Sequence, residues 1–246
     1  MAWVETRSPP FVARHESAAA GEARRILTTL ESARERVAVV LAAELDEVTV
    51  VVHESELLLA LAHPVLPVLR RLTAPAARRY LAGWAAGGEL HVLTPRLLER
   101  RASSVPGSRE MLALTPAALY ARLVLGAANP RLPPPFTAGA TIRFARWAWL
   151  VEGAAQWLSG QTAHARPAIS RRLHEGSEPA FPPGLRDATL LGGSVLDLLA
   201  REEGPKAVAG LLEHLHPRGP NAALAAAFGG RPPARTEDTW RASLRR

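Results

Sequence analysis

The segment from Trp147 to Gly160 constrains the fold most, because it is apolar on almost every side and yet contains a carboxylate. Its sequence, WAWLVEGAAQWLSG, holds half of the 6 tryptophans and a single acidic residue, Glu152. A carboxylate buried without a partner is strongly unfavourable. We therefore expect a buried helix in which Glu152 faces a cation from another segment.

Length and composition limit the class of protein. A chain of 246 residues with 48% hydrophobic residues can bury a sizeable core. No apolar run approaches the roughly 20 residues that span a bilayer, and the polar segment Met1–Pro10 does not have the pattern of a signal peptide. The absence of cysteine excludes disulfides, thiolate zinc sites and cysteine nucleophiles. These features predict a cytoplasmic protein without a membrane partner.

The net charge of +7 raises the question of nucleic-acid binding. All but one of the 30 basic residues are arginine, the exception being Lys206. They are spread along the chain and mixed with 23 acidic residues, without a block of like charge. This distribution favours solvated arginine faces over a nucleic-acid surface, and nucleic-acid binding stays as an alternative.

Hydrophobic periodicity predicts a single α+β domain over residues 1–246, with a sheet-bearing half at about 1–110 and a helical half at about 111–246. Residues 18–45 have the spacing of a long amphipathic helix that begins after Ser17. The β-branched segment 48–53 is typical of a central strand. Other strands are expected within 2–15 and at 89–93, and short helices at 55–62 and 65–72.

Caps and breakers place the later helices. Thr94-Pro95 and Thr115-Pro116 are typical helix starts, and Gly126 is expected to end the second of these helices in a left-handed conformation. Four prolines make Asn129–Pro135 an irregular crossing, and Gly160 ends the tryptophan-rich helix. Further helices are expected at 187–202, 204–215, 220–228 and 236–245.

The order of these elements and one motif carry a resemblance to a known family. Trp149 to Ala155 has the form Trp-Leu-x-Glu-Gly-x-Ala. With the long helix, the apolar strand and a Gly-Gly edge strand before it, this resembles the gluzincin metallopeptidases, and within them the peptidase MA-like group. Leu190–Leu199, Glu203-Gly204-Pro205 and the Phe-Gly…Glu…Trp pattern of residues 228–240 are similar to the family's later segments. The resemblance covers roughly residues 11–246 and implies a zincin-like fold, mostly helical with a small mixed sheet.

The resemblance also implies a zinc site, and this chain departs from it. The family carries His-Glu-x-x-His on one helix, so that two imidazoles and a general base share one helix face, and the glutamate of the later motif is the third ligand. Here Ala118 and Arg122 stand where the two histidines would be, and Leu119 stands where the base would be. We expect a catalytically inactive pseudoenzyme with no metal or other cofactor, in which the Arg122 guanidinium replaces the zinc as the partner of Glu152.

Its role is then expected to be structural, or to be the binding of a peptide or protein in the inherited cleft. The candidate lining residues of this cleft are Tyr120, Trp149 and Gln156. At helical spacing beside apolar neighbours, Trp147, Trp149 and Trp157 are more typical of core residues than of a stacking platform.

An enzyme with other zinc ligands is the second alternative. It would draw on the eight histidines, which are His15, His53, His63, His91, His164, His174, His214 and His216. His15-Glu16 and His53-Glu54 do not complete a metal motif, and His53 is interpreted as a packed residue at a strand end. Gly192-Gly193-Ser194 lacks the second glycine of a nucleophile elbow, and no Gly-Lys-Ser/Thr phosphate loop exists.

Overall fold

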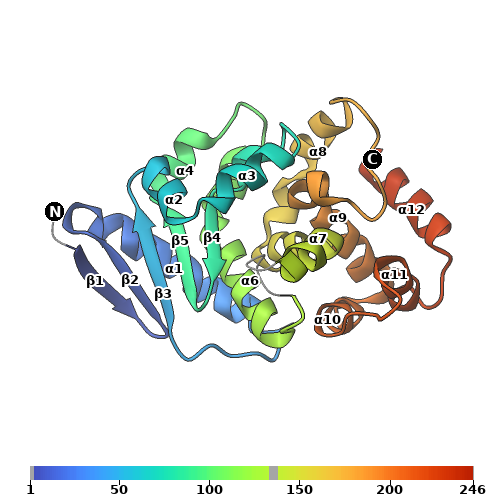
Figure 1. The fold of residues 1–246 in the computed structure, drawn as a ribbon, viewed down its shortest axis with the longest axis horizontal. Coiled ribbons are helices and arrows are strands. Elements are labelled where there is room, and N and C mark those ends of the chain that lie inside the picture. The colour runs from blue at the N-terminus through green and yellow to red at the C-terminus, as the bar shows by residue number, and fades with distance from the viewer. Residues whose placement is uncertain (1–2, 133–137, 246) are drawn as a thin grey trace.

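The computed structural model describes residues 3–132 and 138–245, which are mostly helical and include a five-stranded mixed sheet. All its strands lie within the first 93 residues, and the helices from α7 onward gather on the other side of the molecule (Figure 1). This confirms the predicted α+β class. The strands are β1 (Trp3–Ser8), β2 (Phe11–Glu16), β3 (Val48–His53), β4 (Gly83–Ala86) and β5 (Glu89–Leu93).

The strand order is β1-β2-β3-β5-β4. The inner strands β2, β3 and β5 are parallel, whereas β1 pairs antiparallel with β2 and β4 pairs antiparallel with β5. β3 therefore takes the central place expected from its β-branched sequence. β4 forms the edge of the sheet, joined to β5 by Gly87 and Gly88, both with positive φ.

Outside the sheet, the described chain contains twelve α-helices and three short 3₁₀ helices, joined by turns and loops. Their bounds are η1 (Ser17–Ala19), α1 (Ala20–Ala38), α2 (Glu56–Ala62), α3 (Val65–Leu72), η2 (Arg78–Tyr80), α4 (Pro95–Arg101), α5 (Ser108–Ala113), α6 (Thr115–Ala128), α7 (Ala138–Ser159), η3 (Gln161–His164), α8 (Arg166–Leu173), α9 (Leu185–Glu203), α10 (Pro205–Glu213), α11 (Pro220–Ala227) and α12 (Pro233–Arg245). Among the described residues, no helix is both long and apolar enough to cross a membrane.

The two faces of the sheet have different neighbours. On one face the alternate residues of β3 and β5, such as Val50 and Leu90, are fully buried, and Phe11 of β2 packs edge-on against Tyr120 of α6 with ring centroids 5.3 Å apart. α1 and α6 cover this face. The opposite face carries His53 and His91 near the strand ends, where α2 contacts β3 and β5.

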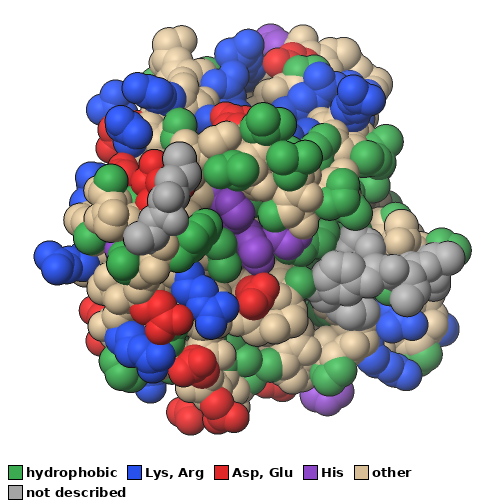
Figure 2. All heavy atoms as spheres, turned by 60° about the vertical axis from the view of Figure 1, so that its left-hand side comes forward, with side chains coloured by type: hydrophobic (Ala, Val, Ile, Leu, Met, Phe, Trp, Pro, Cys, Tyr) green, Lys and Arg blue, Asp and Glu red, His purple; other side chains and the backbone are tan. Residues whose placement is uncertain are grey.

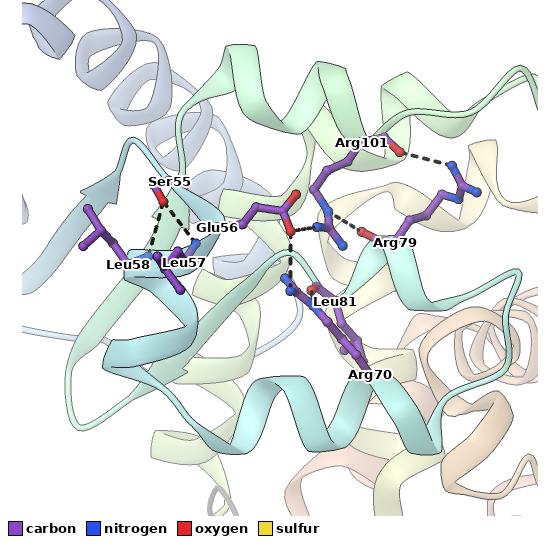
Figure 3. Close-up of polar contacts among 8 residues, drawn as sticks. All are labelled: Ser55, Glu56, Leu57, Leu58, Arg70, Arg79, Leu81 and Arg101. Carbon is purple, nitrogen blue, oxygen red and sulfur yellow. Dashed lines mark hydrogen bonds and ion pairs between the residues drawn. The ribbon is translucent and has the colours of Figure 1, made fainter.

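α2 and α3 form a hairpin that is held by ion pairs on one side. The Glu56 carboxylate lies 2.5 Å from Nη1 of Arg101 and 3.6 Å from Nη1 of Arg70, and Leu58 points away from these arginines (Figure 3). The Ser55 hydroxyl caps α2 by accepting backbone N–H bonds. The hairpin also exposes large aliphatic side chains, which are Leu57, Leu58, Leu61, Val65, Val68 and Leu72.

α7 and α9 cross with their backbones in contact. A Cβ atom on Gly153 would lie 2.6 Å from the Gly192 backbone, and one on Gly192 would lie 2.4 Å from the Trp149 carbonyl oxygen. Only glycine allows so close an approach. The glycine after Glu152 and the Gly-Gly pair at 192–193 therefore belong to one helix crossing, a pairing that sequence spacing did not predict.

Several predicted boundaries were wrong. α1 ends at Ala38 rather than residue 45, because the chain turns at the exposed Val39, and Leu41 reaches the core from an irregular segment. The Gly-Gly pair does not introduce the edge strand, since β4 lies outside β5. The strand β4 and the helices α5 and α8 were not predicted.

The end of α6 also differs from the prediction. Gly126 continues the helix without a left-handed conformation, and α6 runs to Ala128. Asn129 adopts φ −137° and ψ 88°, as expected before Pro130, because a proline disfavours helical geometry in the preceding residue. Residues 133–135 of the predicted proline-rich crossing lie outside the described residues.

Candidate functional site: the Arg122–Glu152 cavity

A small cavity of about 30 Å³ lies where α6, α7 and the start of β4 meet, and we call it the central cavity. It brings together all four residues that the resemblance aligned with the zinc site: Ala118, Leu119 and Arg122 from α6, and Glu152 from α7. Gln156, one turn further along α7, also lines it. Residues separated by 34 positions in the sequence thus meet at one point, as the alignment of both motifs predicted.

The central cavity contains an ion pair. Nη1 of Arg122 lies 3.2 Å from Oε1 of Glu152, and the two side chains are only 11% and 10% exposed. The predicted pairing of Arg122 with Glu152 is confirmed. At this burial each charge depends on the other, because removal of one partner would leave an uncompensated charge in the interior.

The contact between α7 and α9 fixes the position of the helix that carries Glu152. Gly153 lets α9 approach α7, and one turn later the Gln156 side chain bonds to the α9 backbone twice. Its amide nitrogen donates to the carbonyl of Thr189, and its amide oxygen accepts from the N–H of Gly193 at 2.9 Å. Gln156 therefore fixes the position of α7 relative to α9 while it lines the cavity.

The remaining positions of the aligned motif are apolar and packed. A Cβ atom on Gly83 would lie 2.5 Å from Cδ1 of Leu119, so the leucine side chain fills the space beside the edge strand. A methyl group at Ala118 and an isobutyl group at Leu119 neither coordinate a metal nor transfer a proton. The cavity as built can hold opposite charges together, and its side chains at 118 and 119 offer no general base.

Two of the candidate cleft residues lie elsewhere. Trp149 is 1% exposed, and its carbonyl oxygen lies at the α9 crossing. Tyr120 packs against Phe11 under the sheet. Neither residue lines the central cavity. Tyr120 stands two helical positions before Arg122 and therefore lies on a different face of α6. The core assignment of Trp147 and Trp149 is confirmed, whereas Trp157 is half-buried.

A larger apolar pocket of about 380 Å³, the side pocket, adjoins the central cavity at Arg122. It lies between the turn that joins β4 and β5, the last turn of α6 and the middle of α7. Phe144 and Val151 contribute from α7, and Leu123 and Gly126 contribute from α6. Sequence reasoning missed this pocket, because its lining residues come from distant segments and carry no motif.

A second polar cluster lies on the opposite face of the sheet. Nε2 of His53 is 3.0 Å from Nδ1 of His91, and His63 packs edge-on against His91 with ring centroids 4.1 Å apart. His63 also stacks on Trp84, and Glu89 lies 3.3 Å from Nε2 of His91. In the view of Figure 2, histidine side chains gather near the centre of the face, with hydrophobic side chains above them.

Burial lowers the pKa of two of these histidines, His53 and His63. It lowers the pKa of His53 to about 4, with further lowering by His91 and then His63. It lowers the pKa of His63 to about 4 as well, helped by His91. The interpretation of His53 as a packed strand-end residue is thereby confirmed, at 7% exposure. Within residues 3–132 and 138–245, no group of three or more histidine, aspartate or glutamate side chains is arranged to hold a metal ion.

The sequence matches no protein-family model, no curated protein and no solved structure.

Proposed function

We propose that this chain is a metallopeptidase-like protein without catalytic activity. Its cleft, formed by the central cavity and the adjoining side pocket between α6, α7 and β4, binds a ligand rather than cleaving it. The Arg122–Glu152 ion pair is the observation that carries the proposal. Glu152 is the residue that the resemblance assigns as third zinc ligand, and a permanent side-chain cation stands 3.2 Å from it.

Chemistry supports the same proposal. A zinc peptidase needs three protein ligands, an open position for water and a general base. The aligned positions here supply one carboxylate, already paired, together with alanine, leucine and arginine. Arginine does not lose its proton at physiological pH, so it cannot replace the base either.

Restoring the motif tests the metallopeptidase-like arrangement. The variant Ala118→His/Arg122→His should bind one zinc ion per chain through two imidazoles and Glu152, and a further Glu152→Gln change should weaken that binding by at least about tenfold. Zinc content after dialysis is measured by mass spectrometry, and circular dichroism checks that each variant is folded. A folded double-histidine variant with no more zinc than the original chain would overturn the proposed arrangement.

Loss of catalysis is tested on the unaltered protein. We expect less than stoichiometric zinc and no cleavage of a quenched peptide library, with or without added zinc. Adding Leu119→Glu to the double-histidine variant supplies the missing base. Zinc-dependent cleavage by the original chain would contradict the non-catalytic role, whereas cleavage by the triple variant alone would support it.

A further inference from the structure

The side pocket has the size and lining of a small-molecule site. Its volume of about 380 Å³ falls within the range of roughly 300–1,000 Å³ that is usual for ligand pockets. Its walls are aliphatic or aromatic, and Arg122 is the only charged residue among its described lining residues. A pocket of this kind binds an apolar body and leaves one polar contact to orient it.

Arg122 has donors to spare for that contact. The residue lines both cavities, whereas Glu152 lines only the central cavity. A guanidinium carries five N–H donors, and within the described residues the single polar partner of Arg122 is Glu152, reached through Nη1. The guanidinium carbon also lies 6.0 Å from the ring centroid of Phe144, a wall of the side pocket. N–H groups are therefore available beside the pocket.

The charges around the side pocket determine which polar group of a ligand could contact Arg122. The Arg122–Glu152 pair is neutral as a whole, and the pocket also includes Gly126 and Ala127 in the last turn of α6, where the helix dipole is negative. A carboxylate would enter an apolar space near both Glu152 and this helix end. A neutral carbonyl oxygen can accept from the guanidinium without adding a charge.

We infer that the side pocket binds an uncharged acyl compound, an amide or ester with a small apolar body, whose carbonyl oxygen accepts a hydrogen bond from Arg122. The inference deepens the binding role proposed above and rests on it. The acyl group belongs either to a free small molecule or to the backbone of a bound peptide, since the two present the same carbonyl.

Gly126 offers a way to close the pocket without touching Arg122. A Cβ atom at Gly126 meets no atom within 4 Å, although the residue lines the side pocket. Gly126→Leu therefore places a side chain in the open space. Gly210 in α10 is a matched control, because it is also a helix glycine with no atom within 4 Å of a built Cβ and does not line the pocket.

The test is calorimetric titration of the full chain with three probes that share one apolar body: 4-phenylbutanamide, 4-phenylbutyrate and 4-phenylbutylamine. We expect the amide to bind more tightly than either charged probe. Gly126→Leu should weaken amide binding by at least about tenfold, while Gly210→Leu leaves it unchanged. Arg122→Met/Glu152→Leu, which keeps the walls and removes the donors, should abolish the preference for the amide.

Three results would overturn the inference. Tighter binding of the carboxylate would refute the uncharged head group, and binding that survives Gly126→Leu, or no binding of any probe, would refute the site. An acetylated and amidated tripeptide with a central leucine is titrated in parallel, and the tighter of peptide and phenylbutanamide names the source of the acyl group. None of these readouts depends on zinc, so failure here is distinguishable from failure of the restored-motif experiment.

Discussion

The two polar clusters next to edge strand β4 lie on opposite faces of the sheet. Each buries ionisable side chains, and they avoid the cost of a buried unpaired charge in different ways. On the α6 side, Arg122 and Glu152 keep opposite charges and neutralise each other at 3.2 Å. On the other side, His53 and His63 stay uncharged, because burial holds each pKa at about 4. The ion pair stabilises the fold at any pH at which both of its groups are charged. Buried neutral histidines stabilise it only while they stay unprotonated, so acid removes their contribution.

The largest effect should come from breaking the pair. Glu152→Leu leaves the Arg122 guanidinium buried without a counter-charge and should lower the free energy of unfolding by about 3–5 kcal/mol, measured by urea denaturation. The double variant Arg122→Met/Glu152→Leu should recover most of this loss, since no charge remains buried. If the double variant is as unstable as the single one, charge compensation is not what the pair contributes.

Acidification should affect the histidine face next. The folded state binds the His53 proton only near pH 4, whereas the unfolded chain binds it near the ordinary value of 6.5, so stability is present above pH 6.5 and falls as the pH drops toward 4. For His53 the loss should be on the order of 2 kcal/mol between pH 7 and pH 5. Urea midpoints across this range measure it.

Substitutions assign that pH dependence. His53→Gln and His63→Phe should each flatten the curve. A curve that keeps its slope in both histidine variants would show that other groups cause the acid sensitivity.

The smallest effect should come from the carboxylate of the histidine cluster. Glu89 lies 3.3 Å from His91, about as close as Glu152 lies to Arg122, but its side chain is 47% exposed. Solvent screens such a pair, so Glu89→Gln should change the free energy of unfolding by less than about 1 kcal/mol at pH 7. A loss comparable with that of Glu152→Leu would mean that distance, and not burial, sets the contribution of these carboxylates.

The sequence was informative where local chemistry decides the structure. Residues 48–53 form the central strand because of their β-branched composition, and Ser55 and Pro64 delimit the hairpin helices. The ion pair was predictable because residues 118, 119 and 122 share a helix face and Glu152 stands in an apolar helix that needs a cation. These signals need only neighbouring residues or one alignment.

The sequence was uninformative where distant segments decide. Gly83–Ala86 has little intrinsic strand preference and becomes a strand by pairing with β5. His53, His63 and His91 meet through the sheet and the α2–α3 hairpin, and their spacing has no signature. The predicted helix end at Gly126 was wrong because glycine permits a helix end without requiring one. α6 ends at Ala128 instead, before Asn129-Pro130.

The contact between the Gly153 and Gly192 backbones has a mechanical consequence. Side chains can change rotamer to absorb a shift between two helices, but a backbone-to-backbone crossing has none to change. α7 and α9 should therefore move as one rigid body, further tied by Gln156. If the cleft widens, this rigid body must then move relative to α6. The Arg122–Glu152 ion pair joins α6 to α7 and would have to break in that movement.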